Sequence, residues 1–365
     1  MGSGSGILLT GATGFIGGEL LRRLLDRNPD STVYCLVRAR DADQLEARGR
    51  ALLTWVGVVA PDDDRVVVVA GDVAKPELGL GDAYTDLAQR VNEIYHTAAS
   101  TKFDLDLEDA RAVNRDGASH ILGFARKAAE LGGFRRLHHV STAYVAGNHA
   151  GVFVEDQGSD APEFRNTYEQ TKWEAEQILA PEGCAVPVTC YRPSIVVGDS
   201  RTGRTLHFRV LYDPVRWIYS GKIDVLPCRP EVRLDVVPVD YVCDAMLALG
   251  SQTDSAGQTY HLTCGPEGAI AIEEIVRVGV IEANLYNREA GIAPLAPPKI
   301  VSPDAPRSDD PEEREMFERL YAAGQAMMGT HVPYMVTEQL FDPTRTQAAL
   351  RGTGIACPSL GDYLP

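Results

Sequence analysis

The feature that most constrains the fold is a set of three glycines, Gly11, Gly14 and Gly17, between an apolar segment and a leucine-rich one. Ile7–Thr10 has the composition of a short buried strand, and leucine recurs with helical period across Glu19–Arg27. Glycines between such elements allow a tight turn, a close approach of the backbone to a pyrophosphate, and close packing of helix on sheet. The helix N-terminus also favours negative charge. The segment therefore predicts dinucleotide binding, with these contacts: Gly11, Thr13, Gly14, Phe15, Ile16 and Gly17.

The rest of the first half repeats this rhythm of strand and helix. Helical stretches include Val113–Leu131 and Tyr168–Leu179. Further strands are predicted at Thr32–Val37, Val66–Val69, Glu93–His96, Leu137–Val140 and Val188–Arg192. Strands that alternate with helices favour right-handed βαβ units. We therefore expect an α/β fold with a doubly wound, Rossmann-type parallel sheet over residues 7–198, preceded at 1–6 by a flexible Gly/Ser-rich lead or the remnant of a cloning linker.

The rhythm breaks after Gly198. Residues 199–365 are expected to form a smaller substrate-binding lobe, with 232–266 partly returning to the sheet through strands at Leu234–Val239 and Thr259–Thr263. Amphipathic helices are predicted at Ile272–Glu282 and Glu312–Met328. Pro294–Pro306 has five prolines in thirteen residues, which is typical of a linker or a lid.

Composition excludes several classes of function. The 365 residues include 51 acidic and 35 basic side chains, a net charge of −16, which disfavours nucleic acid and anionic membranes as partners. No apolar run is long enough to span a membrane, and the N-terminus lacks the pattern of a secretory signal. The seven cysteines are scattered without a CxxC spacing, which favours reduced thiols and no metal site. We expect a soluble, cytoplasmic protein.

The end of the second strand indicates which dinucleotide binds. An acidic residue there suits the ribose of NAD, whereas this strand ends at Val37 and is followed by Arg38, Arg40 and, about a helix length on, Arg48. Guanidinium groups bind phosphate in a bidentate way, so Arg38 and Arg48 predict NADP(H).

Two further segments follow predicted strands on the cofactor side. Asp72, next to Val73, is placed to accept a hydrogen bond from the adenine amino group. The small residues Ala98, Ala99 and Ser100 would let the cofactor lie against the backbone.

Tyr168 and Lys172 have a YxxxK spacing at the head of a predicted helix. Residues four apart share one face of a helix, and an ammonium near a phenol favours the phenolate. Ser141 and Thr142 follow the fifth predicted strand, about 26 residues upstream, where they can supply a further hydroxyl. The glycine turn, the Ser/Thr pair and YxxxK in this order indicate one site, in which the tyrosine can act as an acid or base beside a dinucleotide.

These motifs resemble the extended short-chain dehydrogenases/reductases, and more narrowly the thioester-reductase and fatty-acyl-CoA-reductase branch. That branch includes terminal reductase domains of nonribosomal peptide and polyketide synthases. The more specific part of the resemblance is Leu36-Val-Arg38, Val140-Ser-Thr-Ala143 and Tyr168-x3-Lys-Trp-x-Ala-Glu176. The resemblance spans roughly residues 7–250. Beyond residue 265, only Phe341-Asp342 and Cys357-Pro358 resemble the family.

The resemblance implies roles for these residues. Tyr168 would protonate the substrate oxygen as hydride arrives from NADPH, Thr142 would hydrogen-bond the same oxygen, and Lys172 would hold the nicotinamide ribose and lower the tyrosine pKa. Asn114 would order a water or a helix near Lys172. The backbone of Pro193, Ser194 and Ile195 would meet the carboxamide.

The resemblance also implies the reaction. The substrate would be an acyl thioester on CoA or on the phosphopantetheine arm of a carrier protein, reduced through a hemithioacetal to an aldehyde. The sequence leaves open a second reduction to the alcohol, the acyl group, the oligomeric state, and whether the chain is free-standing or an excised domain.

Three other functions remain as alternatives. A nucleotide-sugar epimerase or dehydratase is disfavoured because Ala143 and Tyr144 follow Thr142 in place of an Asp-Glu pair, and because Arg38 argues against tightly held NAD. A ketone reductase of the same superfamily is also possible. A redox-sensing regulator that binds NADP without turnover is less favoured, because such proteins tend to lose the Tyr or Lys.

A few residues outside the motifs also invite interpretation. His138 and His139 are expected to be packed strand-end residues, and Trp173 to belong to the core. Substrate contacts are expected from Ser141, Tyr144, Trp217 and Tyr219, the last two on an irregular segment at Val210–Lys222. A basic surface for an acidic carrier is expected from Arg201, Arg204, Arg209 and Arg216.

Overall fold

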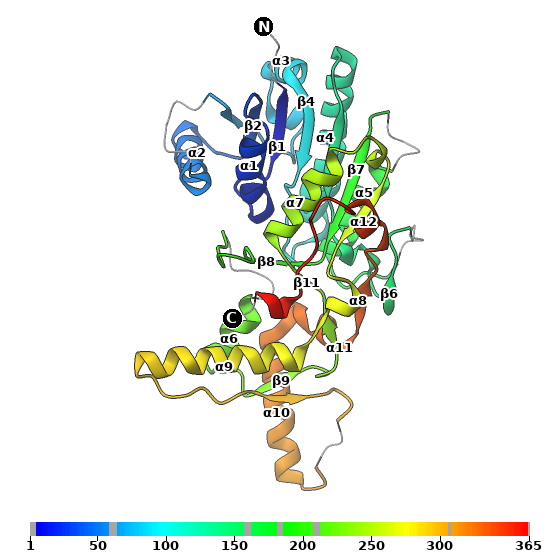
Figure 1. Ribbon diagram of the computed structural model, residues 1–365. Coiled ribbons are helices and arrows are strands. Elements are labelled where there is room, and N and C mark those ends of the chain that lie inside the picture. The colour runs from blue at the N-terminus through cyan, green and yellow to red at the C-terminus, as the bar shows by residue number, and fades with distance from the viewer. Residues whose placement is uncertain are drawn as a thin grey trace.

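A seven-stranded parallel sheet forms the centre of the protein (Figure 1). The computed structural model describes residues 5–57, 64–156, 162–180, 185–206, 212–305 and 308–363. The strands are β1 (Gly6–Thr10), β2 (Thr32–Val37), β3 (Val66–Ala70), β4 (Val91–His96), β5 (Arg136–Val140), β7 (Val188–Pro193) and β12 (Thr259–Leu262). Their order is β12-β7-β5-β4-β1-β2-β3, and every neighbouring pair is parallel. The predicted doubly wound α/β fold is confirmed, and the winding direction reverses between β1 and β4.

Helices cover both faces of the sheet because successive strand residues point to opposite sides. Ile7 and Leu9 of β1 lie in one core cluster with the leucines of α1 (Phe15–Arg27) and the apolar face of α7 (Val239–Gly250). Leu8 between them lies in the opposite cluster. That second face is covered by α3 (Ala83–Arg90), α4 (Leu107–Leu131) and α5 (Thr167–Ile178), while α2 (Ala42–Val56) packs beside α1 on the first.

A smaller lobe lies beyond the carboxyl ends of the strands (Figure 1). It contains α6 (Tyr212–Tyr219), β9 (Val225–Pro227), α9 (Ile272–Ala290), β14 (Lys299–Val301), α10 (Pro311–Met328) and α11 (Val332–Val336). Strand β9 pairs with β14. The hydrophobic core of the lobe includes Leu226, Val276 and Met328. Two expectations need correction here. The proline-rich segment contributes β14 to the β9–β14 pair, and the segment expected to be irregular forms α6 over Tyr212–Tyr219.

The chain crosses between lobe and sheet several times. Two small pairs join the parts: β8 (Ile195–Val197) with β11 (Val236–Pro238), and β10 (Arg233–Leu234) with β13 (Ile270–Ala271). After the lobe, β15 (Gln339–Phe341) pairs with β6 (Gly151–Phe153), and α12 (Thr344–Ala349) packs beside β12. Leu350 then enters the core under α1 and α7. Near the end of the described chain, Leu360 and Tyr363 pack with Val197 and Val236 and with lobe residues such as Tyr212.

Candidate active site

One cavity of about 730 Å³ lies where the sheet meets the lobe. It opens at the carboxyl ends of the strands, beside the point where the winding reverses, which is the usual ligand position in open α/β sheets. Most residues predicted from the sequence meet on its wall. They are Gly11, Thr13, Gly14, Phe15, Ile16, Gly17, Arg38, Arg48, Asp72, Val73, Ala98, Ala99, Ser141, Thr142, Tyr144, Tyr168, Lys172, Pro193, Ser194 and Ile195.

The glycine turn leaves no space for side chains. Gly11 has φ of +75°, and a Cβ there would lie 2.6 Å from the backbone nitrogen of Ala98. A Cβ on Gly17 would lie 2.2 Å from the carbonyl oxygen of Gly11. Helix α1 has Gly14 as its N-cap, with no side-chain cap and no acidic residue in its first turn. Its first amides are therefore available to an anion, so this cradle fits the diphosphate of a dinucleotide.

Hydrogen bonds between strand ends fix the floor of the cavity. The Thr10 hydroxyl lies 2.8 Å from Nδ1 of His96 and accepts from the backbone N–H of Ala98. The Thr97 hydroxyl donates to the carbonyl of Thr10 over 2.8 Å. Burial lowers the pKa of His96 to about 3, so its ring stays neutral near pH 7. The ends of β1 and β4 are thus held together without a charged group beneath the cofactor cradle.

Basic side chains gather at the far end of the cavity, beyond β2. Arg48 on α2 donates from Nη1 to the carbonyl of Arg38 over 2.6 Å, which holds the Arg48 guanidinium against the backbone at the end of β2. An adjoining hollow is lined by Arg38, Arg40, Arg48 and Lys75 together with Asp72. Lys75 was missed by the sequence reasoning; the available signal was its place three residues after Asp72 in the turn that follows β3.

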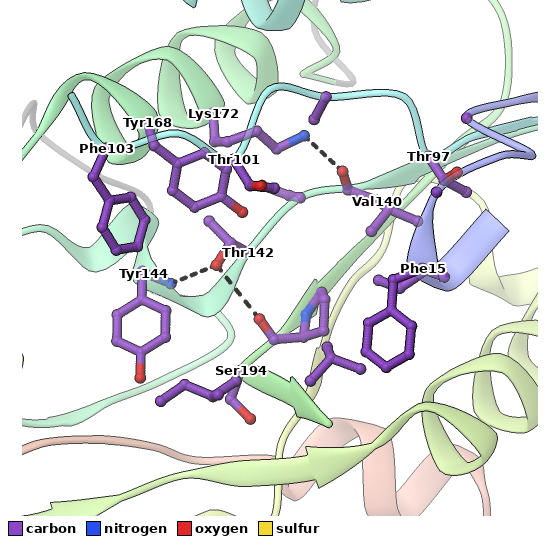
Figure 2. Close-up of a pocket in the computed structure, with 18 of the residues that line it drawn as sticks. Phe15, Thr97, Thr101, Phe103, Val140, Thr142, Tyr144, Tyr168, Lys172 and Ser194 are labelled. Atoms are coloured by element: carbon purple, nitrogen blue, oxygen red, sulfur yellow. Dashed lines mark hydrogen bonds between the residues drawn. The ribbon is translucent and has the colours of Figure 1, made fainter. Parts of the chain in front are cut away.

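The catalytic hydroxyls predicted from the sequence lie together at the centre of the cavity. Thr142 follows β5 and caps the short helix η2 (Ala143–Ala146), with Oγ1 accepting from the N–H of Tyr144 over 3.3 Å. Tyr168 comes from the first turn of α5, whose N-cap Asn166 accepts from the N–H of Glu169. Figure 2 shows the Tyr168 hydroxyl directed toward Thr142, with Tyr144 on the same side.

Lys172 lies one turn after Tyr168, but its ammonium is turned away from the phenol. Nζ donates to the carbonyl oxygen of Val140 over 2.7 Å (Figure 2). Burial lowers the pKa of Lys172 to about 8, opposed by the nearby Cys190 and Glu176. The side chain is therefore mostly charged near pH 7.

Burial raises the pKa of Tyr168 to about 12, and the Thr142 hydroxyl opposes that rise. The expected lowering of the tyrosine pKa by Lys172 does not occur in this structure, because the ammonium is held at Val140 instead. The phenol therefore holds its proton near pH 7.

Two predicted cofactor contacts, Ser100 and Asn114, do not line the cavity. Asn114, on α4, accepts from the N–H of Ser100 over 2.8 Å and donates to the carbonyl of the same residue. Its amide also donates to Oγ1 of Thr171 over 2.9 Å. Asn114 thus connects the loop after β4 to helix α5 immediately before Lys172. Its role in the site is to position these two segments relative to each other.

The two lobe residues predicted from the sequence are not on the cavity wall. Trp217 packs in the lobe core, with its ring 6.3 Å from that of His331, and Tyr219 is 38% exposed. Helix formation explains the difference, because one face of α6 points into the cavity and carries other residues. The lobe contributes these side chains: Pro214, Val215, Ile218, Leu226, Leu234, Ile272, Ile275, Val276, His331, Tyr334 and Met335. Thr101 and Phe103, in the loop after β4, were missed as well.

The remaining sequence expectations concern residues outside the cavity. His138 lies 3.0 Å from the Tyr191 hydroxyl and stacks on Tyr95, and His139 is fully buried. Trp173 packs beside Phe164.

The basic surface expected for carrier docking is described only in part. Arg201 and Arg216 are exposed, and Arg204 stacks over the Trp55 ring at 4.4 Å. Arg209 lies outside the described residues, so the docking surface stays a prediction.

The described residues contain neither a metal-binding cluster nor a membrane-spanning helix. No three or more His, Cys, Asp or Glu side chains there gather as metal ligands. Within the same part of the chain, no helix is both long and apolar enough to cross a membrane. The six cysteines in the described ranges are free thiols, and Cys184 lies outside them.

Comparison with known proteins relates the chain to several reductases. Residues 9–246 match the male sterility protein family of NAD-binding domains. A nonribosomal peptide synthetase (asaC) of Aspergillus flavus is 32% identical over 272 residues, which cover 70% of this chain and 26% of that protein. A putative fatty acyl-CoA reductase of Drosophila melanogaster (CG8303) is 28% identical over 288 residues, covering 67% of this chain and 51% of its own. The chain thus spans about a quarter to a half of the length of these relatives.

A solved structure resembles the whole chain. The terminal R domain from the myxalamid PKS-NRPS biosynthetic pathway has a TM-score of 0.75 and 29% identity, and the match covers 100% of this chain and 89% of that one. The thiolation-reductase di-domain of an archaeal nonribosomal peptide synthetase, 19% identical with a TM-score of 0.69, shares the fold.

Proposed function

Because the chain belongs to the male sterility protein family, in the thioester-reductase branch of the extended short-chain dehydrogenases/reductases, we propose that it uses NADPH to reduce an acyl thioester to an aldehyde. One observation carries this proposal. A single cavity joins the glycine cradle of α1 to Thr142, Tyr168 and Lys172 and continues into an apolar lobe. A cofactor and an acyl group can therefore meet at the catalytic hydroxyls.

The basic corner supports NADPH over NADH. A 2′-phosphate carries charge that the ribose hydroxyl of NADH lacks, and guanidinium groups bind it bidentately. Arg38, Arg40, Arg48 and Lys75 line the hollow beside β2, with Asp72 as the one acidic group on its wall. Four cations against one carboxylate favour the phosphorylated cofactor.

The side chains at the centre suit the reduction of a carbonyl. Bound NADPH would supply the hydride. Tyr168, protonated near pH 7, would give its proton to the substrate oxygen, and the Thr142 hydroxyl would stabilise the charge that develops there. Lys172, mostly charged near pH 7, would stand beside the cofactor ribose. Asn114 would keep α5 in register with the loop that follows β4.

The bonds changed in a thioester substrate can be stated in full. Hydride adds to the carbonyl carbon and the Tyr168 proton to its oxygen, which gives a hemithioacetal. The carbon–sulfur bond then breaks, the thiol leaves with a proton, and an aldehyde remains. A second reduction to the alcohol would need the aldehyde to stay bound while fresh NADPH enters, so the product is set by the rate of aldehyde release.

The relatives suggest the carrier of the acyl group. Because the similar chains include parts of nonribosomal peptide synthetases and a thiolation-reductase di-domain, a phosphopantetheine arm on a carrier protein is the favoured source, with CoA as the other. Both present the same pantetheine thiol to the cavity.

The test uses the purified chain with NADPH and an S-acyl-pantetheine. We expect the oxidation of NADPH to be matched by release of free thiol, one thiol for each NADPH if the product is the aldehyde and one for every two if it is the alcohol. Tyr168→Phe should lower turnover by roughly 10²-fold or more while cofactor binding is kept. Oxidation of NADPH with ketones but no thiol release from any thioester would instead favour a ketone reductase, and would overturn the proposal.

A further inference from the structure

Tyr334 of α11 connects the substrate lobe to the head of the catalytic helix. Its phenol donates to the Glu169 carboxylate, and the side-chain amide of Asn166 donates to the phenol oxygen over 2.7 Å. The guanidinium of Arg165 lies over the ring, 4.9 Å from its centre. Asn166 and Glu169 flank Tyr168 in sequence, so a lobe side chain is held by the same turn that positions the proton donor.

The partners of Tyr334 are themselves fixed. Arg165 and Glu169 form an ion pair whose side chains are 4% and 0% exposed. Glu169 also accepts from the backbone N–H of Arg165, and Arg165 donates to Gln339 over 2.8 Å. A buried carboxylate with several donors has little freedom to move. The phenol of Tyr334 is therefore held in one place, and its ring direction is fixed with it.

The ring of Tyr334 faces the cavity among other aromatic rings. It lies 5.2 Å from the Tyr144 ring in an edge-on arrangement and 5.7 Å from Phe103, which in turn lies 5.8 Å from Tyr168. Figure 2 shows Phe103 and Tyr144 on one side of the Tyr168 and Thr142 hydroxyls. These rings form an aromatic wall, made of Phe103, Tyr144 and Tyr334, next to the groups that receive the carbonyl oxygen.

His331 is the one lobe side chain among the described lining residues that can become charged. The other lobe side chains among them are aliphatic, aromatic or methionine, whereas the Lys, Arg and Asp side chains of the wall come from the helices and loops around the sheet. A charged acyl group would lose its hydration there and would meet no Lys, Arg, Asp or Glu side chain among the described lobe residues of the wall. The compartment beside Tyr334 thus suits an uncharged, apolar acyl group.

We propose that Tyr334 is a specificity-determining residue whose ring closes the acyl compartment at the carbons next to the carbonyl, so that its size sets how much bulk an uncharged acyl group can carry there. The inference rests on the proposed function, because the carbonyl oxygen is placed at Tyr168 and Thr142. An apolar pocket distinguishes two substrates that differ by one methylene by about one to two orders of magnitude in kcat/KM.

The experiment compares two substrates of the full chain, the S-propionyl and the S-(3-phenylpropionyl) thioesters of pantetheine, with NADPH. The measured quantity is the ratio of kcat/KM for the bulky over the small substrate. Tyr334→Ala should raise this ratio by about tenfold or more. Tyr334→Phe keeps the ring and should leave the ratio within about twofold of wild type. Tyr286→Ala, which removes a 67% exposed tyrosine of α9, is the matched control and should not change it.

Two further measurements keep the test decisive. If Tyr334→Ala does not fold, Tyr334→Leu should raise the ratio and Tyr334→Trp should lower it. Affinities for the corresponding S-alkyl thioethers, which cannot be reduced, give the same size ratio without turnover. Wild type that reduces neither thioester would refute the proposed function, whereas a size ratio of affinities that is equal in wild type and Tyr334→Ala would refute the role of Tyr334. An equal loss of kcat/KM on both thioesters in Tyr334→Ala would also refute it, since that is the mark of a purely structural residue.

Discussion

Replacement of Lys172 by methionine should make the protein more stable while removing its activity. Lys172 is 2% exposed, and burial lowers its pKa from 10.5 to about 8. At about 1.4 kcal/mol for each pKa unit, holding this charge in the folded state costs roughly 3 kcal/mol near pH 7. Methionine has a similar length without the charge, and loses only the hydrogen bond to the carbonyl of Val140, which is worth about 1 kcal/mol.

The net expectation is a gain of about 2 kcal/mol in the free energy of unfolding near pH 7, or roughly 4 °C in Tm for a chain of this size. The sign of the pH dependence follows from the lowered pKa. Folded Lys172 holds its proton more weakly than the unfolded chain, so unfolding takes up a proton between about pH 8 and pH 10.5. Wild-type stability from this group therefore rises with pH across that window, and the advantage of the methionine variant disappears there.

Urea unfolding of wild type and Lys172→Met at a series of pH values measures this difference, since all other titrating groups are common to both chains. Lys222→Met is the control, because Lys222 is exposed, and it should change stability by less than about 0.5 kcal/mol. The reasoning would be refuted if Lys172→Met were less stable than wild type near pH 7, or if the difference between them did not vary between pH 8 and pH 10.5.

Three further predictions concern the cofactor side of the cavity. Gly17→Ala should abolish NADPH binding in calorimetric titrations and lower Tm, because its Cβ would lie 2.2 Å from the carbonyl oxygen of Gly11. Arg48→Ser should weaken NADPH binding by about tenfold and leave NADH binding unchanged; equal losses for both would place Arg48 away from the 2′-phosphate. Asn114→Ala removes three hydrogen bonds and should destabilise the fold by about 3 kcal/mol in urea unfolding, with kcat reduced and the KM for NADPH less affected.

The sheet half of the cavity could be predicted from the sequence because its residues follow strands. In a parallel sheet the carboxyl ends meet at one edge, so Gly11 after β1, Arg38 after β2 and Thr142 after β5 had to converge once the strands were identified. Tyr168 and Lys172 joined them through helical spacing alone. The direction of the Lys172 ammonium could not be predicted, since it depends on a carbonyl of β5 that the YxxxK pattern does not contain.

The lobe half could not be predicted, and α6 shows why. Trp217 and Tyr219 were expected on the wall because they are aromatic and lie in a segment without an evident pattern. In helix α6 they do not line the cavity, whereas Val215 and Ile218 do. Which face of a short helix is buried depends on its partners, here α9 and the strand pair β9–β14, and these come from distant parts of the chain. Tyr334 is the extreme case, because its phenol bonds to Glu169, 165 residues away in sequence. A wall assembled from such contacts leaves no local pattern, so variants of the acyl compartment have to be chosen from the packing of the lobe.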